Sequence, residues 1–414
     1  MDPIVIGIVG AGFAASFHVE NYRRVPGLNI RIKGVTAKRA KSAQTFAKRH
    51  QLETTYDSIE ELLTDPEITI VDLCVPNFLH HPLVIQAAQA GKHIVCEKPL
   101  TGYFGDGTEK LVGHKISRKT MFEHALKSAD EMIDAVKRNG VIFCYAENWI
   151  YAPSIQKANN ILGQSENTIF RIVAEESHSG SHSAYAKEWR YSGGGSLFYK
   201  GCHPVAGALY LKYNEGLRKE GKPIKPKSVL AQVANLTQID SFVHEDKKWV
   251  QDGWKDCEDW GTMVITFTDD SIAQITAADI VLGGIKNIIT VYSSKSVIQC
   301  NINPNTSMLS YVPDEQVLGN VYIREKVETR AGWQLTNPDE DWMNGFPHEL
   351  EDFCQAITNR QAPKSTLELA RDIAEMFNKT YNIDFFPIPE PQIFGEAKRV
   401  MSLSCLLYTS PSPR

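Results

Sequence analysis

The chain has little that would direct it to a membrane or to nucleic acid. No run of apolar residues reaches the roughly 18 that a membrane-spanning helix needs. The formal net charge is −5, and both signs are mixed along the 414 residues, so there is no basic excess for phosphate backbones or anionic lipids. We therefore expect neither a nucleic-acid nor a membrane partner.

Paired cysteines are also missing. The eight cysteines are scattered singly, and none has the Cys-x-x-Cys spacing of a zinc site or a redox pair, so no metal is predicted. Free thiols buried in apolar runs are typical of a reducing compartment, which predicts a cytoplasmic protein. The apolar opening MDPIVIGIVGAGFAASF has no charged n-region and predicts a strand and a turn rather than a signal peptide.

The first hundred residues alternate short apolar runs with helical patterns. Strands are predicted at 4–9, 30–35, 70–75 and 93–96, and helices at 14–24, 40–49, 59–63 and 82–90. Alternation of this kind with short turns predicts an α/β Rossmann domain with a parallel, doubly wound sheet. The length of the chain favours a second domain.

The pattern changes after this region. Residues 102–124 are rich in glycine and charge and predict an irregular excursion, followed by a helix at 128–138 and a strand at 141–146. Longer strands are then predicted at 169–175, 228–237, 261–267, 272–279, 288–292 and 296–301, and closing helices at 348–358 and 366–382. Runs of strands with few helices between them predict an α+β domain with a large, mainly antiparallel open sheet.

These patterns divide the chain into four parts. We predict a Rossmann dinucleotide-binding domain at 1–124, an α+β substrate and oligomerisation domain at 125–385, and a C-terminal segment at 386–404. The final stretch, CLLYTSPSPR, has no helix or strand period and resembles translated adapter DNA. Residues 405–414 are therefore predicted to be a non-native tail.

The turn after the first predicted strand carries the first chemical motif. Gly10-Ala11-Gly12-Phe13-Ala14-Ala15 is a G-x-G-x-x-A turn that opens a predicted helix. Gly10 permits the tight turn, Gly12 lets the backbone approach a pyrophosphate, and Ala15 keeps the helix close to the sheet. The helix N-terminus, which includes Phe13 and Ala14, offers N–H groups to the phosphates. A dinucleotide site is predicted here.

The end of the second predicted strand lacks a carboxylate. An acidic residue there would bind the 2′-hydroxyl of NAD, whereas a basic residue accommodates the 2′-phosphate of NADP. Lys38 and Arg39 follow the strand and could bind a phosphate, or they could be ordinary solvated charges at the start of a helix. NADP is favoured over NAD on this basis.

Four further stretches carry a resemblance. They are DLCVPNFLH at 72–80, AGKHIVCEKPL at 90–100, AENWIYAP at 146–153 and GGGSLFYKGCH at 193–203. In this order after the glycine turn they resemble the Gfo/Idh/MocA oxidoreductases, the family of glucose–fructose oxidoreductase and inositol dehydrogenase. The resemblance covers most of residues 1–385. It implies an NAD(P)-dependent enzyme that oxidises a secondary alcohol, or reduces a ketone, on a sugar, glycoside or cyclitol.

The resemblance also implies roles for individual residues. Pro76, Asn77 and His80 match positions that line the cofactor. Glu97 and Lys98 match residues at the nicotinamide ribose, with Lys98 reaching the substrate hydroxyl. His203 matches the acid/base histidine, and a side chain with a pKa near 6.5 suits that task. A free lysine would be a poor base, but burial beside a cationic nicotinamide is expected to lower the pKa of Lys98.

The sequence departs from the family pattern at one position. The family commonly has an aspartate four residues before the histidine, and here that residue is Tyr199. A tyrosine hydroxyl can donate or relay a proton but carries no charge at neutral pH, and the adjacent Lys200 is not an equivalent. We expect either a Lys98–His203 pair assisted by Tyr199 or a mechanism shifted from simple alcohol oxidation.

A polar stretch precedes this motif. Trp149 and Trp189 could stack on a sugar ring, while His178, His182 and Arg190 could bind its hydroxyls. Glu176, His178, His182 and His203 could instead form a metal site, although Gly180 and the serines disfavour a helix that would align His178 with His182. The stretch could also be plain loop surface. His348 could face the same cleft or merely start the following helix.

Alternatives from other functional classes remain open. The departure at Tyr199 leaves room for an NAD-dependent glycosidase or lyase that oxidises its sugar transiently, without net turnover of the cofactor. A non-catalytic nucleotide sensor would keep the fold alone. Because an open antiparallel sheet commonly pairs its face with another subunit, a homo-oligomer is expected, either a dimer or a tetramer.

Overall fold

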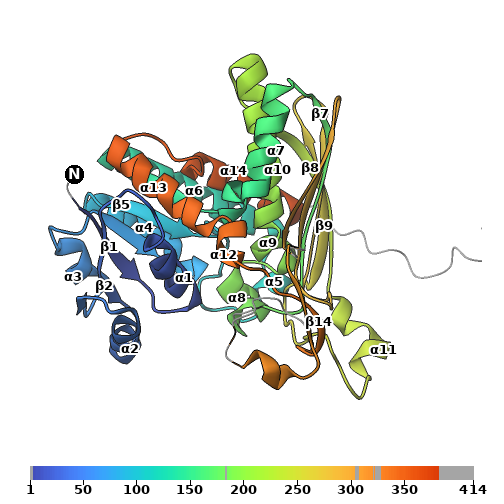
Figure 1. Cartoon of the computed structure of the whole chain (residues 1–414), viewed down its shortest axis with the longest axis horizontal. Helices are drawn as coiled ribbons and strands as arrows, with labels where there is room; N and C mark the ends of the chain where they lie inside the picture. Colours follow the sequence, from blue (N-terminus) through green and yellow to red (C-terminus); the bar gives the residue numbers. More distant parts are fainter. Residues whose placement is uncertain (1–2, 182–183, 304–306, 320, 322–327, 382–414) are drawn as a thin grey trace, which may run out of the picture. The chain divides into compact units, whose positions relative to one another are not determined.

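Two six-stranded sheets organise the chain (Figure 1), as described by a computed structural model. The structure describes residues 3–181, 184–303, 307–319, 321 and 328–381. The predicted segment 386–404 and the predicted tail 405–414 lie outside the described residues. No helix among the described residues is long and apolar enough to cross a membrane.

The first sheet is entirely parallel, and its strand order is β3-β2-β1-β4-β5-β6. Its strands are β1 (Ile4–Val9), β2 (Ile30–Thr36), β3 (Thr54–Thr55), β4 (Ile70–Leu73), β5 (His93–Glu97) and β6 (Phe143–Ala146). From β1 the chain adds strands first on one side of the sheet (β2, β3) and then on the other (β4, β5, β6). This order is that of the Rossmann fold, so the predicted fold of the first domain is confirmed. The sixth strand lies beyond the domain boundary predicted at residue 124, and the placement of that boundary stays a prediction.

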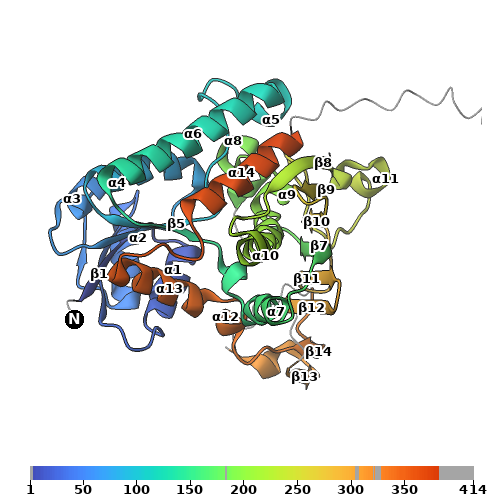
Figure 2. The same cartoon turned by 90° about the horizontal axis from the view of Figure 1, so that it is seen from above.

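Helices connect these strands. They are α1 (Phe13–Tyr22), α2 (Ala40–His50), α3 (Ile59–Thr64), α4 (His80–Gln89), α5 (Val112–Lys115) and α6 (Arg118–Asn139). Figure 2 shows α4 and α6 side by side, and they pack against each other. The four strands and four helices predicted in the first hundred residues are all present, with boundaries within a few residues of those expected, whereas β3 and α5 were not predicted.

The prediction of an irregular excursion over 102–124 is wrong for its second half. Helix α6 begins at Arg118, ten residues earlier than expected. Ser117 caps it by accepting a hydrogen bond from the N–H of Thr120. The buried side chains Met121, Ala125 and Ala129 are spaced four residues apart and give this part of the helix an apolar stripe. The charged residues between them obscured that period in the sequence.

The second sheet has the order β12-β11-β7-β10-β9-β8. Its strands are β7 (Ile169–Ser177), β8 (Pro226–Ala234), β9 (Trp260–Phe267), β10 (Ile272–Ala278), β11 (Lys286–Ser293) and β12 (Val297–Asn303). Every adjacent pair is antiparallel except β7 and β10. A large, mainly antiparallel open sheet is thus confirmed, and its six strands are the six predicted.

The helices of this region are α7 (Pro153–Gln164), α8 (Trp189–Ser192), α9 (Ser196–Tyr199), α10 (Cys202–Glu220), α11 (Asp240–Val243), α12 (Glu340–Met343), α13 (Phe346–Asn359) and α14 (Leu367–Tyr381). Helices α7 and α10 lie along one face of the second sheet (Figure 1). The two closing helices return to the first sheet, where α13 packs on α1 and α14 on α6 (Figure 2).

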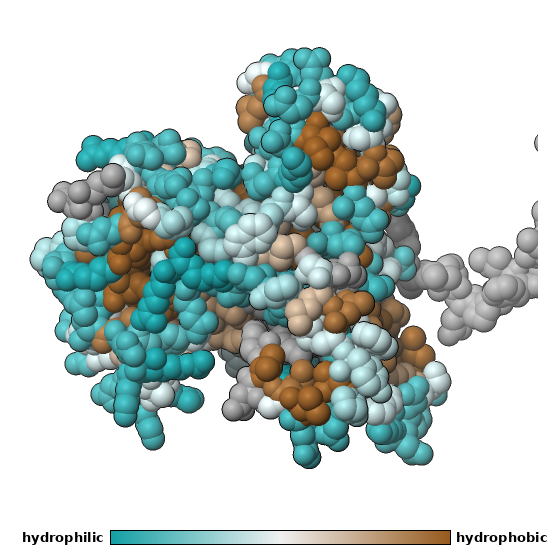
Figure 3. All heavy atoms as spheres, in the orientation of Figure 1, coloured by the Kyte–Doolittle hydropathy of each residue, from teal (hydrophilic) through white to brown (hydrophobic). Residues whose placement is uncertain are grey.

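Hydrophobic side chains also remain at the surface. A small sheet of β13 (Leu309–Val312) and β14 (Gly332–Leu335) carries Tyr311 and Trp333, which are 61% and 72% exposed. Figure 3 shows apolar side chains gathered at the lower edge of the view, in the region of β14. On the face of the second sheet opposite α10, Leu230 is 70% exposed.

The turn between β1 and α1 explains its glycines. Gly10 has φ +113°, a conformation that side-chain-bearing residues rarely adopt, and a Cβ there would lie 2.2 Å from the carbonyl oxygen of Cys74. A Cβ at Gly12 would meet no heavy atom within 4 Å. Ala15 is fully buried. Gly10 is therefore required by the turn itself, whereas Gly12 leaves space in front of the helix.

These glycines lead to a stability prediction. Gly10→Ala should lower the free energy of unfolding by at least about 2 kcal/mol, because it adds backbone strain and a clash with Cys74. Urea denaturation followed by circular dichroism measures it. Gly12→Ala is the control and should change stability by less than about 1 kcal/mol. Equal midpoints for Gly10→Ala and the unmodified chain would show that the turn is not constrained as described.

Candidate functional site

A cleft of about 1140 Å³ opens where the strands of the first sheet end and the second sheet begins. The loops after β1, β2, β4, β5 and β6 form one wall, and the end of β7 with α9 and the start of α10 form the other. Ligands of open α/β sheets bind outside the carboxyl ends of the strands, where the strand order reverses. The cleft lies at this position.

The glycine turn lines the cleft and fits a dinucleotide. Gly10, Gly12, Phe13 and Ala14 contribute to its wall, whereas Ala15 packs beneath them. The N-cap of α1 is Gly12, which has no side chain to cap the helix, and a helix N-terminus of this kind attracts a phosphate through its N–H groups. The open space at Gly12 allows the close approach that a pyrophosphate needs.

Basic side chains stand at the end of β2, as predicted. Lys38 and Arg39 both line the cleft and are exposed, and Ser42 lies one turn further along. The cleft wall also contains Asp57, from the loop between β3 and α3. This end of the cleft therefore offers two cations and a hydroxyl, with one carboxylate at the opposite rim.

The segment after β4 contributes both residues that line the cleft and a buried residue behind its wall. Pro76 and Asn77 line it, and the amide of Asn77 donates to the carbonyl of Ser192 at 2.6 Å, which ties the two walls together. His80 does not line the cleft, contrary to the prediction. It is fully buried, and its ring nitrogens lie 3.0 Å from the carbonyl oxygens of Pro99 and Val75. His80 therefore supports the backbone of the cleft wall from behind.

Glu97 and Lys98 reach the cleft from the end of β5. The ammonium of Lys98 donates to the carbonyl of Tyr199 at 3.1 Å, and its backbone N–H donates to the Glu97 carboxylate at 3.0 Å. Burial lowers the pKa of Lys98, as expected, but Cys202 and the carboxylates of Glu176, Glu97 and Glu147 outweigh burial and raise it. The expected net lowering is thus reversed by the protein's own acids.

His203 lies opposite Lys98, in the first turn of α10. Its Nδ1 is 2.6 Å from the Oε1 of Glu147, a residue that follows β6 and is fully buried. A carboxylate accepts hydrogen bonds, so Nδ1 is the donor in this contact and Nε2 is the ring nitrogen on the other side. The ring stacks on Trp149, with centroids 5.8 Å apart and planes 14° apart. Glu147 thus fixes both the tautomer and the orientation of His203.

Glu147 is a site residue that the sequence analysis did not single out. It lies in the AENWIYAP stretch, and its position after a strand of the first sheet was the available signal. Glu176, from the end of β7, was considered in the sequence only as a possible metal ligand. Its Oε2 lies 3.9 Å from Nε2 of His203, and burial raises the pKa of this carboxyl despite the nearby cations. His203 is therefore flanked by two acids.

Tyr199 belongs to a second network beside the first. Its hydroxyl donates to the carboxylate of Asp279, which follows β10 and is fully buried. The same carboxylate lies 2.8 Å from the ammonium of Lys200, which in turn lies 3.1 Å from Nδ1 of His178. Tyr199, Lys200 and His178 all line the cleft. The family pattern has an aspartate at position 199. Here Tyr199 occupies that position, and the carboxylate of Asp279 contacts it.

The other predicted substrate residues are divided between the cleft and the interior. Trp149 and His178 line the cleft, but Trp189 and Arg190 do not. The indole N–H of Trp189 donates to the carbonyl of Tyr103 at 3.0 Å, which turns the ring into the core. The guanidinium of Arg190 pairs with Glu188. Helix α8 is only four residues long. The backbone N–H of Trp189, at its start, donates to the carboxylate of Asp256, and this contact sets the orientation of the helix and of the Trp189 ring.

Two histidines remain to be placed. His182 lies outside the described residues. His348 lies in the first turn of α13 and does not line the cleft. The centroid of its ring is 5.1 Å from that of Trp342. The structure therefore favours the second of the two roles considered for His348, the start of a helix.

Groups of possible metal ligands occur twice in the described part of the chain. They are His18 with Asp72 and Cys74, and His203 with Glu147 and Cys202. In both groups the histidine and the carboxylate already contact each other directly, at 2.8 and 2.6 Å. These direct hydrogen bonds account for both groups.

Comparison with known proteins agrees with this geometry. Residues 4–112 match the family model of the Gfo/Idh/MocA oxidoreductases, described as "Oxidoreductase family, NAD-binding Rossmann fold". Levoglucosan dehydrogenase of Pseudarthrobacter phenanthrenivorans is 26% identical over 217 residues, which cover 50% of this chain and 47% of that protein. Trans-1,2-dihydrobenzene-1,2-diol dehydrogenase of Bos taurus is 26% identical over 194 residues, covering 46% and 51%.

The fold is shared over a greater length. The solved structure of GenD2 from gentamicin A biosynthesis, in complex with NAD, has a TM-score of 0.74 and 18% identity, and the match covers 92% of this chain and 94% of that one. By sequence, however, the chain spans about half the length of the curated dehydrogenases it matches. Residues 4–112 therefore resemble the NAD-binding part of the Gfo/Idh/MocA oxidoreductase family, and the names of the dehydrogenase relatives agree with that match.

Proposed function

We propose that the protein is an NAD(P)-dependent dehydrogenase or reductase that acts on a secondary alcohol or ketone of a sugar, glycoside or cyclitol. One observation carries the proposal. Lys98, from the first sheet, and His203, from the helix on the second, line the same cleft as the glycine turn. A dinucleotide site and a group able to move a hydroxyl proton therefore share one cavity.

The dinucleotide would be held by the glycine turn, by Pro76 and Asn77, and by Glu97. When bound, the nicotinamide supplies the hydride acceptor or donor. Support for this arrangement comes from the space in front of Gly12, at the N-terminus of α1.

The proton chemistry belongs to His203. Its Nε2 lone pair accepts the proton of the substrate hydroxyl, and Glu147 on Nδ1 stabilises the imidazolium that forms. The ammonium of Lys98, whose pKa is raised by the surrounding acids, stays protonated and donates to the substrate oxygen as negative charge develops there. Lys98 thus acts as an electrostatic stabiliser, and His203 as the base.

The rest of the cleft supports a polyhydroxylated substrate. Trp149 offers an apolar face, while His178, Tyr199 and Glu176 surround it with hydrogen-bonding groups. The named substrates of two relatives, levoglucosan and a dihydrobenzenediol, are cyclic compounds of this kind. A carbohydrate-like or cyclitol substrate is the class that this lining favours.

The basic end of the cleft favours NADP as the preferred cofactor. Lys38 and Arg39 stand where a 2′-phosphate would lie, and no acidic residue follows β2 directly. We also propose a reducing, cytoplasmic setting, because the seven described cysteines are all buried and unpaired.

We further propose a homo-oligomer, a dimer or a tetramer, formed through the second sheet. Leu230, Ile272, Tyr292 and Val297 are between 39% and 70% exposed on its strands. Helices cover only one face of this sheet among the described residues (Figure 1). A second copy that packs on the open face would bury these side chains.

The catalytic assignment can be tested directly. Lys98→Met and His203→Ala should each lower kcat for oxidation of a polyol by roughly 100-fold or more, because the first removes the cation that stabilises the developing oxygen charge and the second removes the base. NAD(P)H formation is measured on a panel of sugars, glycosides and inositols.

Trp189→Phe is the control for this test and should keep activity, because Trp189 does not line the cleft. Unchanged rates in Lys98→Met and His203→Ala would contradict the assignment. Release of free sugar without net NAD(P)H formation would support the glycosidase alternative instead.

Cofactor preference gives a second test. Arg39→Ala should weaken NADPH binding by roughly tenfold and leave NADH binding nearly unchanged, since only NADPH carries the 2′-phosphate. Dissociation constants are measured by nucleotide fluorescence. Lys48→Ala, an exposed cation in the last turn of the same helix, should change neither. Tighter binding of NADH than of NADPH by the unmodified protein would reverse the preference.

The oligomer gives a third test. Leu230→Glu should reduce the molar mass measured by size-exclusion chromatography with light scattering, because it places a charge in the proposed interface. Leu217→Glu, at a leucine of α10 that is 51% exposed, is the control and should leave the mass unchanged. A monomeric mass for the unmodified protein would contradict the proposal.

A further inference from the structure

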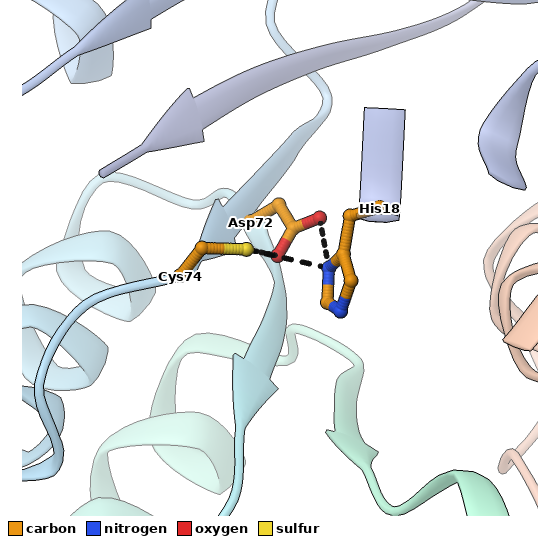
Figure 4. A group of neighbouring side chains, drawn as sticks. All are labelled: His18, Asp72 and Cys74. Atoms are coloured by element: carbon orange, nitrogen blue, oxygen red, sulfur yellow. Dashed lines mark hydrogen bonds and ion pairs between the residues drawn. The ribbon is translucent and has the colours of Figure 1, made fainter. Parts of the chain in front are cut away.

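His18, in the middle of α1, lies behind the cleft wall between two carboxylates. Its Nδ1 is 2.8 Å from Oδ2 of Asp72, and its Nε2 is 3.2 Å from Oε1 of Glu97. Figure 4 shows the ring turned toward Asp72, with the thiol of Cys74 beside it. His18 and Asp72 are both fully enclosed, with exposed fractions of 1% and 0%.

Glu97 is the member of this group that reaches the cleft. Its side chain is 16% exposed and lines the cavity, and its other carboxylate oxygen accepts the backbone N–H of Lys98. One oxygen is thus held by His18 from behind and the other by Lys98 from the side. The carboxylate has little freedom to turn.

Charge explains why this arrangement is stable inside the protein. Burial lowers the pKa of His18, but the carboxylate of Asp72 and the thiol of Cys74 outweigh burial, and the pKa is raised well above its usual value. The contact with His18 in turn lowers the pKa of Glu97 against its own burial. His18 is therefore an imidazolium at neutral pH, and Glu97 is ionised.

Other titratable groups also face His18. Tyr22 follows one turn later on α1, and Glu349 approaches from α13. Burial raises the pKa of the Glu349 carboxyl well above its ordinary range, so that this residue is neutral and adds no competing charge. Burial likewise raises the pKa of Tyr22. Asp72 and Glu97 are the two anions that the imidazolium bridges.

We propose that His18 is a positioning residue, which bridges Asp72 and Glu97 so that the Glu97 carboxylate is fixed at the wall of the dinucleotide site. This inference rests on the proposed function, because only there is Glu97 assigned to the dinucleotide. His18 itself touches neither the cleft nor the reacting atoms. Its effect is transmitted through Glu97.

The variant His18→Asn tests the bridge. An asparagine side chain is too short to contact both carboxylates, so Glu97 loses its partner. We expect the dissociation constant of NAD(P)H to rise about tenfold, because the ion pair that holds the Glu97 carboxylate in place is lost. The KM for the dinucleotide should rise in parallel, while the KM for the alcohol substrate stays the same.

Two variants serve as controls. His50→Asn removes another buried histidine, whose Nε2 lies 3.1 Å from the hydroxyl of Ser16 on the same helix α1. It loosens α1 without touching Glu97 and should leave dinucleotide binding unchanged. Glu97→Gln should reproduce the effect of His18→Asn, and the double variant should be no worse than either single variant.

The pH dependence of dinucleotide affinity distinguishes a positioning role of His18 from a merely structural one, because only the positioning role depends on the charge of His18. The bridge is intact while His18 is protonated and is lost as pH rises through its raised pKa. Dinucleotide affinity should therefore be steady at neutral pH and weaken in alkali. Asp72→Asn removes the carboxylate that raises this pKa, so the loss of affinity should begin at lower pH. This comparison does not need a folded His18 variant.

The outcomes separate the two proposals. If the unmodified protein binds no dinucleotide, the proposed function and this inference both fail. If it binds, but His18→Asn binds equally well, or if Asp72→Asn leaves the pH profile unmoved, only the role of His18 is overturned. Weaker binding by His18→Asn and His50→Asn alike would also overturn it, because the effect would then come from α1 as a whole.

Discussion

The hydrogen bond between His203 and Glu147 joins the two halves of the site. Glu147 follows the last strand of the first sheet, and His203 begins the helix that covers the second. Both side chains are buried, so breaking the bond would leave a charge without a partner in a medium of low dielectric. The geometry of the cleft depends on this contact, because it fixes the distance between the end of β6 and the start of α10.

Local sequence was sufficient for those parts of the fold that local physics decides. The turn at Gly10 needs a positive φ, and strands of alternating burial such as β9 leave a period of two in the sequence. Helix α6 was placed too late because its apolar stripe starts among charged residues near Ser117. Helix α6 packs against α4 and α14, and composition alone does not record these contacts.

From the sequence, site residues could be predicted only where they lie in a recognisable motif. Lys98 and His203 were found through motifs, although they come from different sheets and are 105 positions apart in the numbering. Glu147 was missed, and Glu176 was considered only as a metal ligand, because each acquires its place beside His203 through folding of segments distant in sequence. Trp189 was assigned to the cleft on residue type alone. Its true direction follows from a bond to Asp256, which no short-range pattern contains.

The tyrosine at position 199 does not leave the site short of negative charge. Asp279 contacts its hydroxyl from the end of β10, and the same carboxylate compensates the ammonium of Lys200, which is only 2% exposed. A lysine so deeply buried lowers the stability of the fold unless an acid lies within reach. Burial does lower the pKa of Lys200, and Asp279 opposes that shift. Tyr199 and Lys200 are therefore compatible with this cleft because an aspartate, Asp279, directly follows β10 and contacts both side chains.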